Sequence, residues 1–444
     1  MSISSSLAGV RVVELAHIMA GPVCGLLLAD MGADVVKVER LPSGDGSRGY
    51  VPPEIGGESA AFMMLNRGKR GIALDLRSGE GGAVVRRLAS GADVLIENFR
   101  VGTMERMGLG WDALAELNPR LVYCQITGFG RTGPLAAQGG FDLIAQGYAG
   151  LMSITGERPG GAPVKVGAPV TDITAGMLGA FGIVSALLER ERTGRGQRVD
   201  TSLLEAGITH TFWQSAIALA SGDAPGPMGS AHPLAAPYQA FRTADGWINV
   251  GASNEATWRR LTEALERPEL AEDPRFVTNA NRMANLSALA DVLEPVLAAR
   301  PTREWLEDLE RVGVPAGPVA SIAEMLEHPQ TRAREMVIEV EHTRLGAVRA
   351  LGSAVKMSGS DRLAAPEAPD AGFEVGSESS GETSGSAAGD PVGSDGGASG
   401  LPRGAPLLGE HTREVLAEAG YSVEEVEGLI RRGVAREPRG PAGA

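Results

Sequence analysis

The sequence has very little cysteine. Cys24 and Cys124 are the only two in 444 residues, too few for a disulfide framework and without the paired spacing of a zinc site. The sequence therefore predicts a protein of a reducing compartment, the cytoplasm, with no metal site.

Positive charge is also scarce. Lys and Arg number 41 against 55 Asp and Glu, which gives a net charge of −14 and a pI near 5.1. A protein whose main partner is nucleic acid normally carries a basic domain or stripe, so this class is excluded. An anionic small molecule stays open, because a few local arginines suffice to bind it.

Long apolar segments are lacking as well. The N-terminus, Met1 to Leu7, has no basic stretch followed by an apolar one, so it does not predict a secretory signal. The longest apolar run, Met177 to Leu188, contains two glycines and ends at Glu189, too short to cross a bilayer. We expect a soluble protein with no membrane partner.

Glycine and proline, by contrast, are abundant. The chain has 61 glycines and 27 prolines, well above the ~12% that the two residues reach together in an average protein. The backbone is therefore expected to be rich in turns and in places of close approach.

The first two hundred residues alternate strand-like and helix-like segments. An apolar, β-branched run at 10–15, a helical pattern at 23–30 and a second strand-like run at 34–39 form a βαβ unit. The rhythm continues with helices near 81–89 and 111–117, followed by strands near 93–96 and 121–126. The sequence predicts an α/β fold with a large, Rossmann-like parallel-sheet domain.

Composition suggests where the domains change. We predict that residues 1–220 begin the large α/β domain, that 221–330 form a smaller α+β domain, and that 331–358 and 406–444 return to the large one. Residues 359–405 are rich in Gly, Ser and acids with few apolar side chains, so we predict a disordered insert.

Common enzyme motifs are missing. The turn after the first strand reads Leu15 to Pro22 without the G-x-G-x-x-G spacing of a dinucleotide site, although Glu39 lies where a ribose-binding acid would. No G-x-S-x-G elbow and no H-E-x-x-H helix occurs. His17 lies where α/β sheets bind ligands, at the carboxyl end of the first strand, but a structural role is favoured for it.

Asp172 is the acid that stands out, directly before a long apolar helix. Spacing alone favours an N-cap there, because a carboxylate satisfies free N–H groups at a helix start. The functional alternative is a carboxylate nucleophile for acyl transfer. Its natural substrate in a protein without a predicted metal is an activated acyl group such as a thioester of coenzyme A (CoA).

CoA is a polyanion and needs positive charge. The N-terminal third offers arginines after predicted strands, each of which could equally belong to a solvated surface: Arg40, Arg67, Arg70, Arg77, Arg100 and Arg106.

Several motifs together resemble class III coenzyme A transferases, the superfamily of formyl-CoA transferase, carnitine CoA-transferase and α-methylacyl-CoA racemase. The resemblance covers nearly the whole chain outside 359–405. The motifs are Ala20-Gly21-Pro22, Gly32-Ala33-Asp34 through Glu39-Arg40, Asn66-Arg67-Gly68-Lys69-Arg70, Glu97-Asn98-Phe99, Arg106-Met107-Gly108, Thr193-Gly194-Arg195-Gly196-Gln197 and Pro406-Leu407-Leu408-Gly409-Glu410-His411-Thr412.

The resemblance implies a role for particular residues. Asp172 falls on the family's nucleophile, which forms an acyl-aspartyl anhydride and then an aspartyl-CoA thioester. Contacts to CoA fall on Arg40, Leu74, Arg77, Asn98, Phe99 and Arg106. CoA and acyl-CoA are substrates, so no permanently bound cofactor is expected. The family fold implies a large and a small domain and an interlocked homodimer.

Departures from the family pattern narrow the reaction. Phe141 and Asn254 replace the histidine and glutamate of the racemase branch, which leaves α-proton abstraction without its base. Met19 replaces the glutamine of formyl-CoA transferases, which weighs against formate and oxalate. We expect a CoA transferase with a donor such as succinyl-CoA and a carboxylic acid acceptor. The alternatives are a racemase or isomerase, and a non-catalytic CoA-binding scaffold.

Overall fold

The computed structural model describes residues 6–357 and 400–438. Seven strands form one sheet in the order β14-β5-β2-β1-β6-β7-β8. Strand β1 pairs in parallel with β2, β2 with β5, and β7 with β8, whereas β14 is antiparallel to β5. This largely parallel sheet confirms the predicted α/β class. Its strands are β1 (Arg11–Glu14), β2 (Asp34–Arg40), β5 (Arg70–Leu74), β6 (Val94–Glu97), β7 (Val122–Thr127), β8 (Arg198–Ser202) and β14 (Ala435–Arg436).

The chain divides into two compact units. The first comprises Met1–Ile18, Gly25–Leu95 and Arg334–Ala444, and the second comprises Met19–Cys24 and Ile96–Ala333. Helix α1 (Ala20–Asp30) begins in the second unit and ends in the first. The domain boundaries proposed from the sequence stay a prediction.

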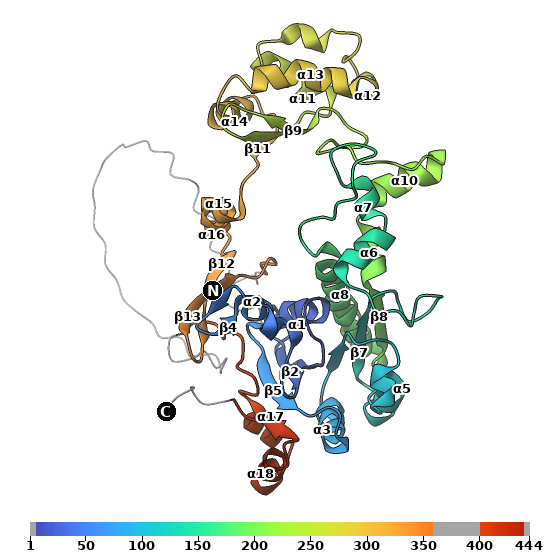
Figure 1. Cartoon of the computed structure of the whole chain (residues 1–444), viewed down its shortest axis with the longest axis vertical. Helices are drawn as coiled ribbons and strands as arrows, with labels where there is room; N and C mark the ends of the chain where they lie inside the picture. The colour runs from blue at the N-terminus through green and yellow to red at the C-terminus, as the bar shows by residue number, and fades with distance from the viewer. Residues whose placement is uncertain (1–5, 358–399, 439–444) are drawn as a thin grey trace, which may run out of the picture. The chain divides into compact units, whose positions relative to one another are not determined.

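The first unit joins the two ends of the chain. Figure 1 shows the red C-terminal helices near blue strand β5, and the Gly71 N–H donates to His411 Nδ1 over 3.1 Å. Besides its sheet strands, this unit contains α2 (Ala60–Asn66), α3 (Gly79–Ser90), α17 (Thr412–Glu418), α18 (Val423–Arg431), the 3-10 turn η1 (Gly46–Gly49) and the hairpins β3 (Glu54–Ile55) with β4 (Glu58–Ser59) and β12 (Val337–His342) with β13 (Gly346–Leu351).

The second unit holds most of the helices. They are α4 (Thr103–Arg106), α5 (Trp111–Leu117), α6 (Asp142–Tyr148), α7 (Leu151–Ile154), α8 (Val170–Thr193), α9 (Leu203–Thr209), α10 (Phe212–Ser221), α11 (Glu255–Ala264), the 3-10 turn η2 (Pro268–Ala271), α12 (Asn279–Ala284), α13 (Leu286–Leu297), α14 (Thr302–Arg311), α15 (Ile322–Glu327) and α16 (Pro329–Ala333).

Within the second unit, a small sheet has a hydrophobic core of its own. Strands β9 (Tyr238–Arg242), β10 (Trp247–Gly251) and β11 (Ala316–Pro318) are antiparallel in the order β11-β10-β9. Phe241, Ile248, Trp258, Leu293 and Trp305 belong to the core between this sheet and helices α11 to α14 (Figure 1). Strands and helices thus share one core in this part of the second unit.

Helix α8 is the longest helix of the described residues and is apolar. Among the described helices it alone is long and apolar enough to cross a membrane by length and composition. The apolar run considered from the sequence, residues 177–188, is shorter than this helix and did not indicate that it is long enough to cross a membrane. One face of α8, with Ala175, Gly179, Ile183 and Leu187, is buried, and the helix packs on β7, β8 and α9. Helix α8 therefore contributes one face to the core beside the seven-stranded sheet, and its opposite face is exposed.

The predicted disordered insert lies mostly outside the described residues. Residues 400–405, its final part, are described: Arg403 forms a β-bridge with Glu341, and Ala405 is buried.

Candidate active site

Asp172 is the third residue of α8. The N-cap is Pro169, and no side chain hydrogen-bonds to the helix start from that position. The interpretation of Asp172 as an N-cap is therefore wrong, because the residue already lies within the helix.

Asp142, at the start of α6, satisfies the α8 terminus instead. Its Oδ1 accepts from the Thr171 N–H at 3.0 Å and from Thr171 Oγ1 at 2.8 Å. Its Oδ2 accepts from Gln146 Nε2 at 2.8 Å. No sequence pattern indicates this contact, because 29 positions separate Asp142 from Thr171.

Asp172 has no such partners. It is half-buried, and among the described residues no hydrogen bond or ion pair reaches its carboxylate. Burial, and to a lesser degree the charge of Asp142, raises the pKa of Asp172 to about 7. Asp142 thus accepts hydrogen bonds from three donors, whereas the Asp172 carboxylate accepts none from the described residues and has a raised pKa. A basic carboxylate without hydrogen-bond partners is the state that a nucleophile requires.

A glycine brings α8 close to the start of α1. A Cβ atom on Gly176 would lie 2.6 Å from the Ala20 carbonyl oxygen and 2.8 Å from Val23 Cβ, so only glycine fits there. Gly176 is one helical turn beyond Asp172, about 6 Å along the axis. The beginning of α1, directly after Met19, thus lies near the turn that carries Asp172.

Five of the six arginines considered in the sequence separate into two groups. Arg67 forms a paired contact with Asp30, and Arg70 contacts Asp34, Glu414 and Glu418. These two guanidiniums are committed to ion pairs within the first unit. They are therefore structural residues rather than ligand contacts.

Arg40, Arg77 and Arg106 are exposed and form no ion pair with any described residue. Arg106 donates a single hydrogen bond, to Thr103 Oγ1 at 3.0 Å. Arg40 lies beside Leu74, its register partner between β2 and β5, and Leu74 is fully buried. In this structure Leu74 packs in the core, whereas the three guanidiniums remain available for an anion.

Asn98 and Phe99 follow β6, and buried Glu97 fixes the backbone there. Glu97 Oε2 accepts from the Phe99 N–H at 2.8 Å, and Tyr123 Oη donates to Oε1 at 3.5 Å. Burial raises the pKa of Glu97 to about 8. Asn98, Phe99, Arg106 and Asp172 belong to the second unit, whereas Arg40, Leu74 and Arg77 belong to the first.

Metal ligands do not gather in the part of the chain that the structure describes, where no three His, Cys, Asp or Glu side chains are arranged to hold an ion. Both cysteines are buried, and neither forms a disulfide.

Comparisons with known proteins agree with one another. The family model described as CoA-transferase family III matches residues 7–375. The chain is 42% identical over 341 residues to the succinate–glutarate CoA-transferase of Agrobacterium fabrum, covering 76% of this chain and 85% of that protein. It is 40% identical over 371 residues to the acetyl-CoA:oxalate CoA-transferase of Acetobacter aceti, covering 82% and 93%. The crystal structure of a CAIB/BAIF family protein from Brucella suis matches with a TM-score of 0.75 and 38% identity, covering 93% of this chain and 99% of that one.

Proposed function

The chain belongs to CoA-transferase family III and is a CoA transferase, and from that premise we propose that it moves CoA from succinyl-CoA to a dicarboxylic acid through a covalent relay on Asp172. The unpartnered Asp172 carboxylate in the first turn of α8 is the observation that carries this proposal.

The proposed relay has four balanced steps. Asp172 Oδ attacks the thioester carbonyl of the donor, and the C–S bond breaks to give an acyl-aspartyl anhydride and CoA thiolate. The thiolate attacks the aspartyl carbonyl, which releases the donor carboxylate and leaves an aspartyl-CoA thioester. The acceptor carboxylate displaces the thiolate to form a second anhydride. The thiolate then attacks the acceptor carbonyl, which yields the new thioester and restores Asp172.

Each step exchanges a carboxylate with a thiolate, so the relay needs no proton donor. It needs an ionised, poorly solvated nucleophile and positive or N–H groups that stabilise the tetrahedral oxyanion. A carboxylate whose pKa lies near 7 is more basic than an ordinary one, and about half of it is ionised at pH 7. Asp142 contributes because it accepts the hydrogen bonds of Thr171 at the start of α8, and the Asp172 carboxylate is not used for them.

CoA itself requires cationic and planar groups. We assign its phosphates to the exposed guanidiniums of Arg40, Arg77 and Arg106, and further contacts to the segment of Asn98 and Phe99. Leu74, also assigned to CoA by resemblance, is fully buried in this structure and is the weakest of the assignments.

A dicarboxylate acceptor is supported by the relatives. The names of two of them specify succinate, glutarate and oxalate, all dicarboxylic acids. Because one of those relatives acts on oxalate, identity alone does not separate oxalate from longer acids. Met19 next to the start of α1 favours the longer ones, since a thioether side chain is less suited to bind a second charged carboxylate at short range.

The test replaces Asp172 by Asn and by Ala and measures CoA transfer from succinyl-CoA to a panel of dicarboxylates. Both variants should lose at least about 1,000-fold in turnover, as expected when a nucleophile is removed. The matched control is Asp112→Asn, which removes another acid in the first turn of a helix, α5. Undiminished turnover in Asp172→Ala would disprove the relay. Deuterium uptake from solvent at the α-carbon of an acyl-CoA would instead indicate racemase chemistry.

We also propose that the protein is a homodimer. The outward face of α8 carries large apolar side chains, Met177, Phe181, Val184 and Leu188, with Phe181 73% exposed. Such a stripe of large apolar side chains along one helix face requires a cover. A second copy of the chain is the partner implied by the resemblance to the family.

A further inference from the structure

The loop after β1 is held in a costly backbone conformation. Ile18 has a φ of 68°, in the left-handed region, which a β-branched side chain rarely adopts. Such strain persists only where surrounding contacts enforce it, and it is concentrated at functional sites. The contacts that enforce it here can be named.

The buried ion pair of Lys37 and Asp45 forms hydrogen bonds with the backbone of this loop on both sides of His17. Lys37 Nζ donates to the Ala16 carbonyl oxygen at 2.9 Å, and Asp45 Oδ1 accepts from the Ile18 N–H at 3.0 Å. Lys37 Nζ and Asp45 Oδ2 lie 2.8 Å apart, and both side chains are essentially inaccessible to solvent. The pair thus fixes the carbonyl before His17 and the N–H after it.

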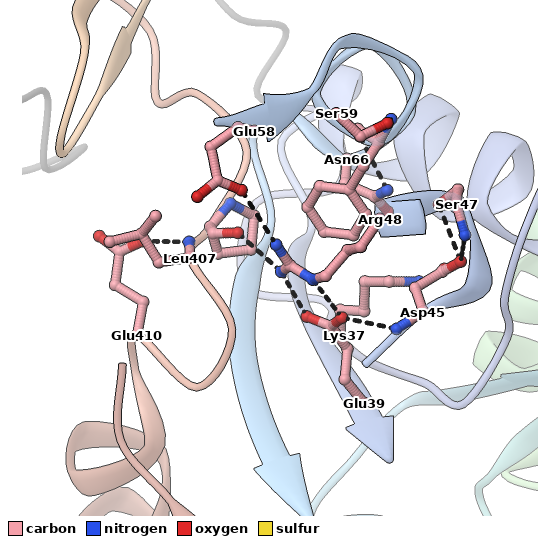
Figure 2. Close-up of polar contacts among 12 residues, drawn as sticks. Lys37, Glu39, Asp45, Ser47, Arg48, Glu58, Ser59, Asn66, Leu407 and Glu410 are labelled. Carbon is pink, nitrogen blue, oxygen red and sulfur yellow. Dashed lines mark hydrogen bonds and ion pairs between the residues drawn. The ribbon is translucent and has the colours of Figure 1, made fainter. Parts of the chain in front are cut away.

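The pair is itself anchored by further charges. Lys37 also contacts Glu14 Oε1 at 2.9 Å, and Glu14 Oε2 lies 2.8 Å from Lys69 Nζ, with all three side chains fully buried. The Asp45 N–H donates to Glu39 Oε2 at 2.9 Å, and Asp45 Oδ1 accepts from the N–H and hydroxyl of Ser47. Figure 2 shows Lys37, Glu39, Asp45 and Ser47 gathered around the end of β2.

Stability alone does not account for this arrangement. Two buried charges lose their hydration, and replacing such a pair by apolar side chains is often neutral or stabilising. The bonds from the pair to the backbone of the loop, however, have no apolar substitute. The network is therefore better explained as a device that sets the position of the loop.

The loop lies at the edge where the proposed CoA contact begins. Strands β1 and β2 are parallel neighbours, so the loop after Glu14 and Arg40 at the end of β2 emerge at the same edge. Burial, together with the charges of Lys37 and Arg40 and against that of Asp45, lowers the pKa of His17. The parallel pairing of β1 and β2 thus places the loop at the same sheet edge as an arginine that we assign to CoA.

We propose that Asp45 and Lys37 are positioning residues for CoA binding, which hold loop 16–19 in the strained conformation that contacts CoA. The proposal rests on the proposed function, because it takes CoA as the ligand. Neither residue touches CoA; both act through the backbone of His17 and Ile18.

The test is a double-mutant cycle between Asp45 and Ile18, read by calorimetric titration of the full chain with CoA. Asp45→Ala should weaken CoA binding by about tenfold or more. Without Asp45, Ile18 relaxes from its positive φ, and the free energy needed to restore that conformation is then subtracted from the binding free energy. Glycine adopts positive φ without strain, so Ile18→Gly alone should change the affinity by less than about threefold. In the Ile18→Gly background, Asp45→Ala should cost no more than about threefold.

Two further variants separate positioning from folding. Asp45→Asn keeps an acceptor for the Ile18 N–H and should lose about threefold or less. If Asp45→Ala does not fold, Lys37→Met, which removes the hydrogen bond to the Ala16 carbonyl oxygen, takes its place in the cycle with the same expected losses. Asp30→Asn breaks the comparably buried contact with Arg67 at the other end of α1, about 15 Å along the helix. It should lower the thermal midpoint and leave the affinity for CoA unchanged.

Additive losses in the cycle would overturn the proposal, because a merely structural Asp45 does not depend on the residue at position 18. Unchanged affinity in both Asp45 variants would overturn it too. A wild type that transfers CoA but whose Asp45 variants bind normally refutes the positioning role alone. A wild type that binds CoA with the predicted coupling but transfers none refutes the relay alone, and a wild type that does not bind CoA refutes both.

Discussion

Asp172 in the first turn of α8 and Asp142, which contacts that turn from α6, show how environment assigns different roles to the same side chain. Asp142 is satisfied by Thr171 and Gln146 and serves the helix terminus. Asp172, one residue beyond Thr171, has no partner among the described residues and a raised pKa. The proposed nucleophile therefore stays basic, because burial raises its pKa and Asp142 accepts the hydrogen bonds at the helix start.

The burial of Asp172 should cost stability in a pH-dependent way. Below about pH 4 the carboxyl is protonated in both the folded and the unfolded chain, so Asp172→Asn changes little. Between the ordinary value of 3.8 and about 7 the unfolded chain loses the proton first, which lowers the stability of the folded wild type. Asp172→Asn should thus stabilise the protein by about 2–4 kcal/mol at about pH 8.

Denaturant unfolding of both proteins at the two pH values measures this effect. A gain of equal size at both pH values would contradict the assigned pKa. Asp112→Asn on α5 is the control and should show no such pH-dependent gain.

The ionisation of Asp172 should also govern acylation. Because only the carboxylate attacks, the single-turnover rate at limiting succinyl-CoA should rise as pH increases through about 7 and level off above it. Below this range it should fall about tenfold per pH unit. Rapid-quench measurement of the succinate released gives the rate, and a profile that is flat from about pH 5.5 to 8 would contradict an Asp172 nucleophile with this pKa.

At the scale of elements, the start of α8 depends on a side chain from α6. Asp142→Ala removes the acceptor for the Thr171 N–H and hydroxyl, so we expect a loss of about 1–2 kcal/mol in unfolding free energy. Asp172→Ala should show no such loss. The N-cap interpretation predicts the reverse order, and chemical denaturation of the two variants distinguishes them.

Local elements could be predicted from the sequence because local signals define them. The helix predicted at 111–117 matches α5 residue for residue, and the strand predicted at 34–39 is one residue shorter than β2. Capping by Asp142 could not be predicted, because its partner is distant in the chain. The hydrogen bonds from Lys37 and Asp45 to the loop after β1 could not be predicted either, since no sequence pattern in the loop or around these two residues indicates that they meet.

Candidate site residues were predictable mainly through the family motifs. Spacing alone favoured the wrong role for Asp172, and it did not distinguish Arg67 and Arg70 from Arg40. That distinction depends on Asp30, Asp34 and the acids of α17, which approach these arginines only in the folded chain.

At the scale of the whole molecule, the account requires a cover for the outer face of α8. Phe181→Glu places a charge in the apolar stripe and should convert the proposed dimer to a species of 46.0 kDa, the mass of one chain. Leu117→Glu, at an exposed apolar position on α5 that is 43% accessible, is the control and should leave the dimer intact. Light scattering after size-exclusion chromatography measures the mass, and a monomeric wild type would contradict the proposed dimer.

The covalent relay on Asp172 is the central claim, and trapping its intermediate tests it most directly. Wild-type protein incubated with succinyl-CoA and then with hydroxylamine should be modified at Asp172, as found by peptide mass spectrometry, and Asp172→Asn should remain unmodified. Modification at another carboxylate, or active transfer with no modified residue, would contradict the account.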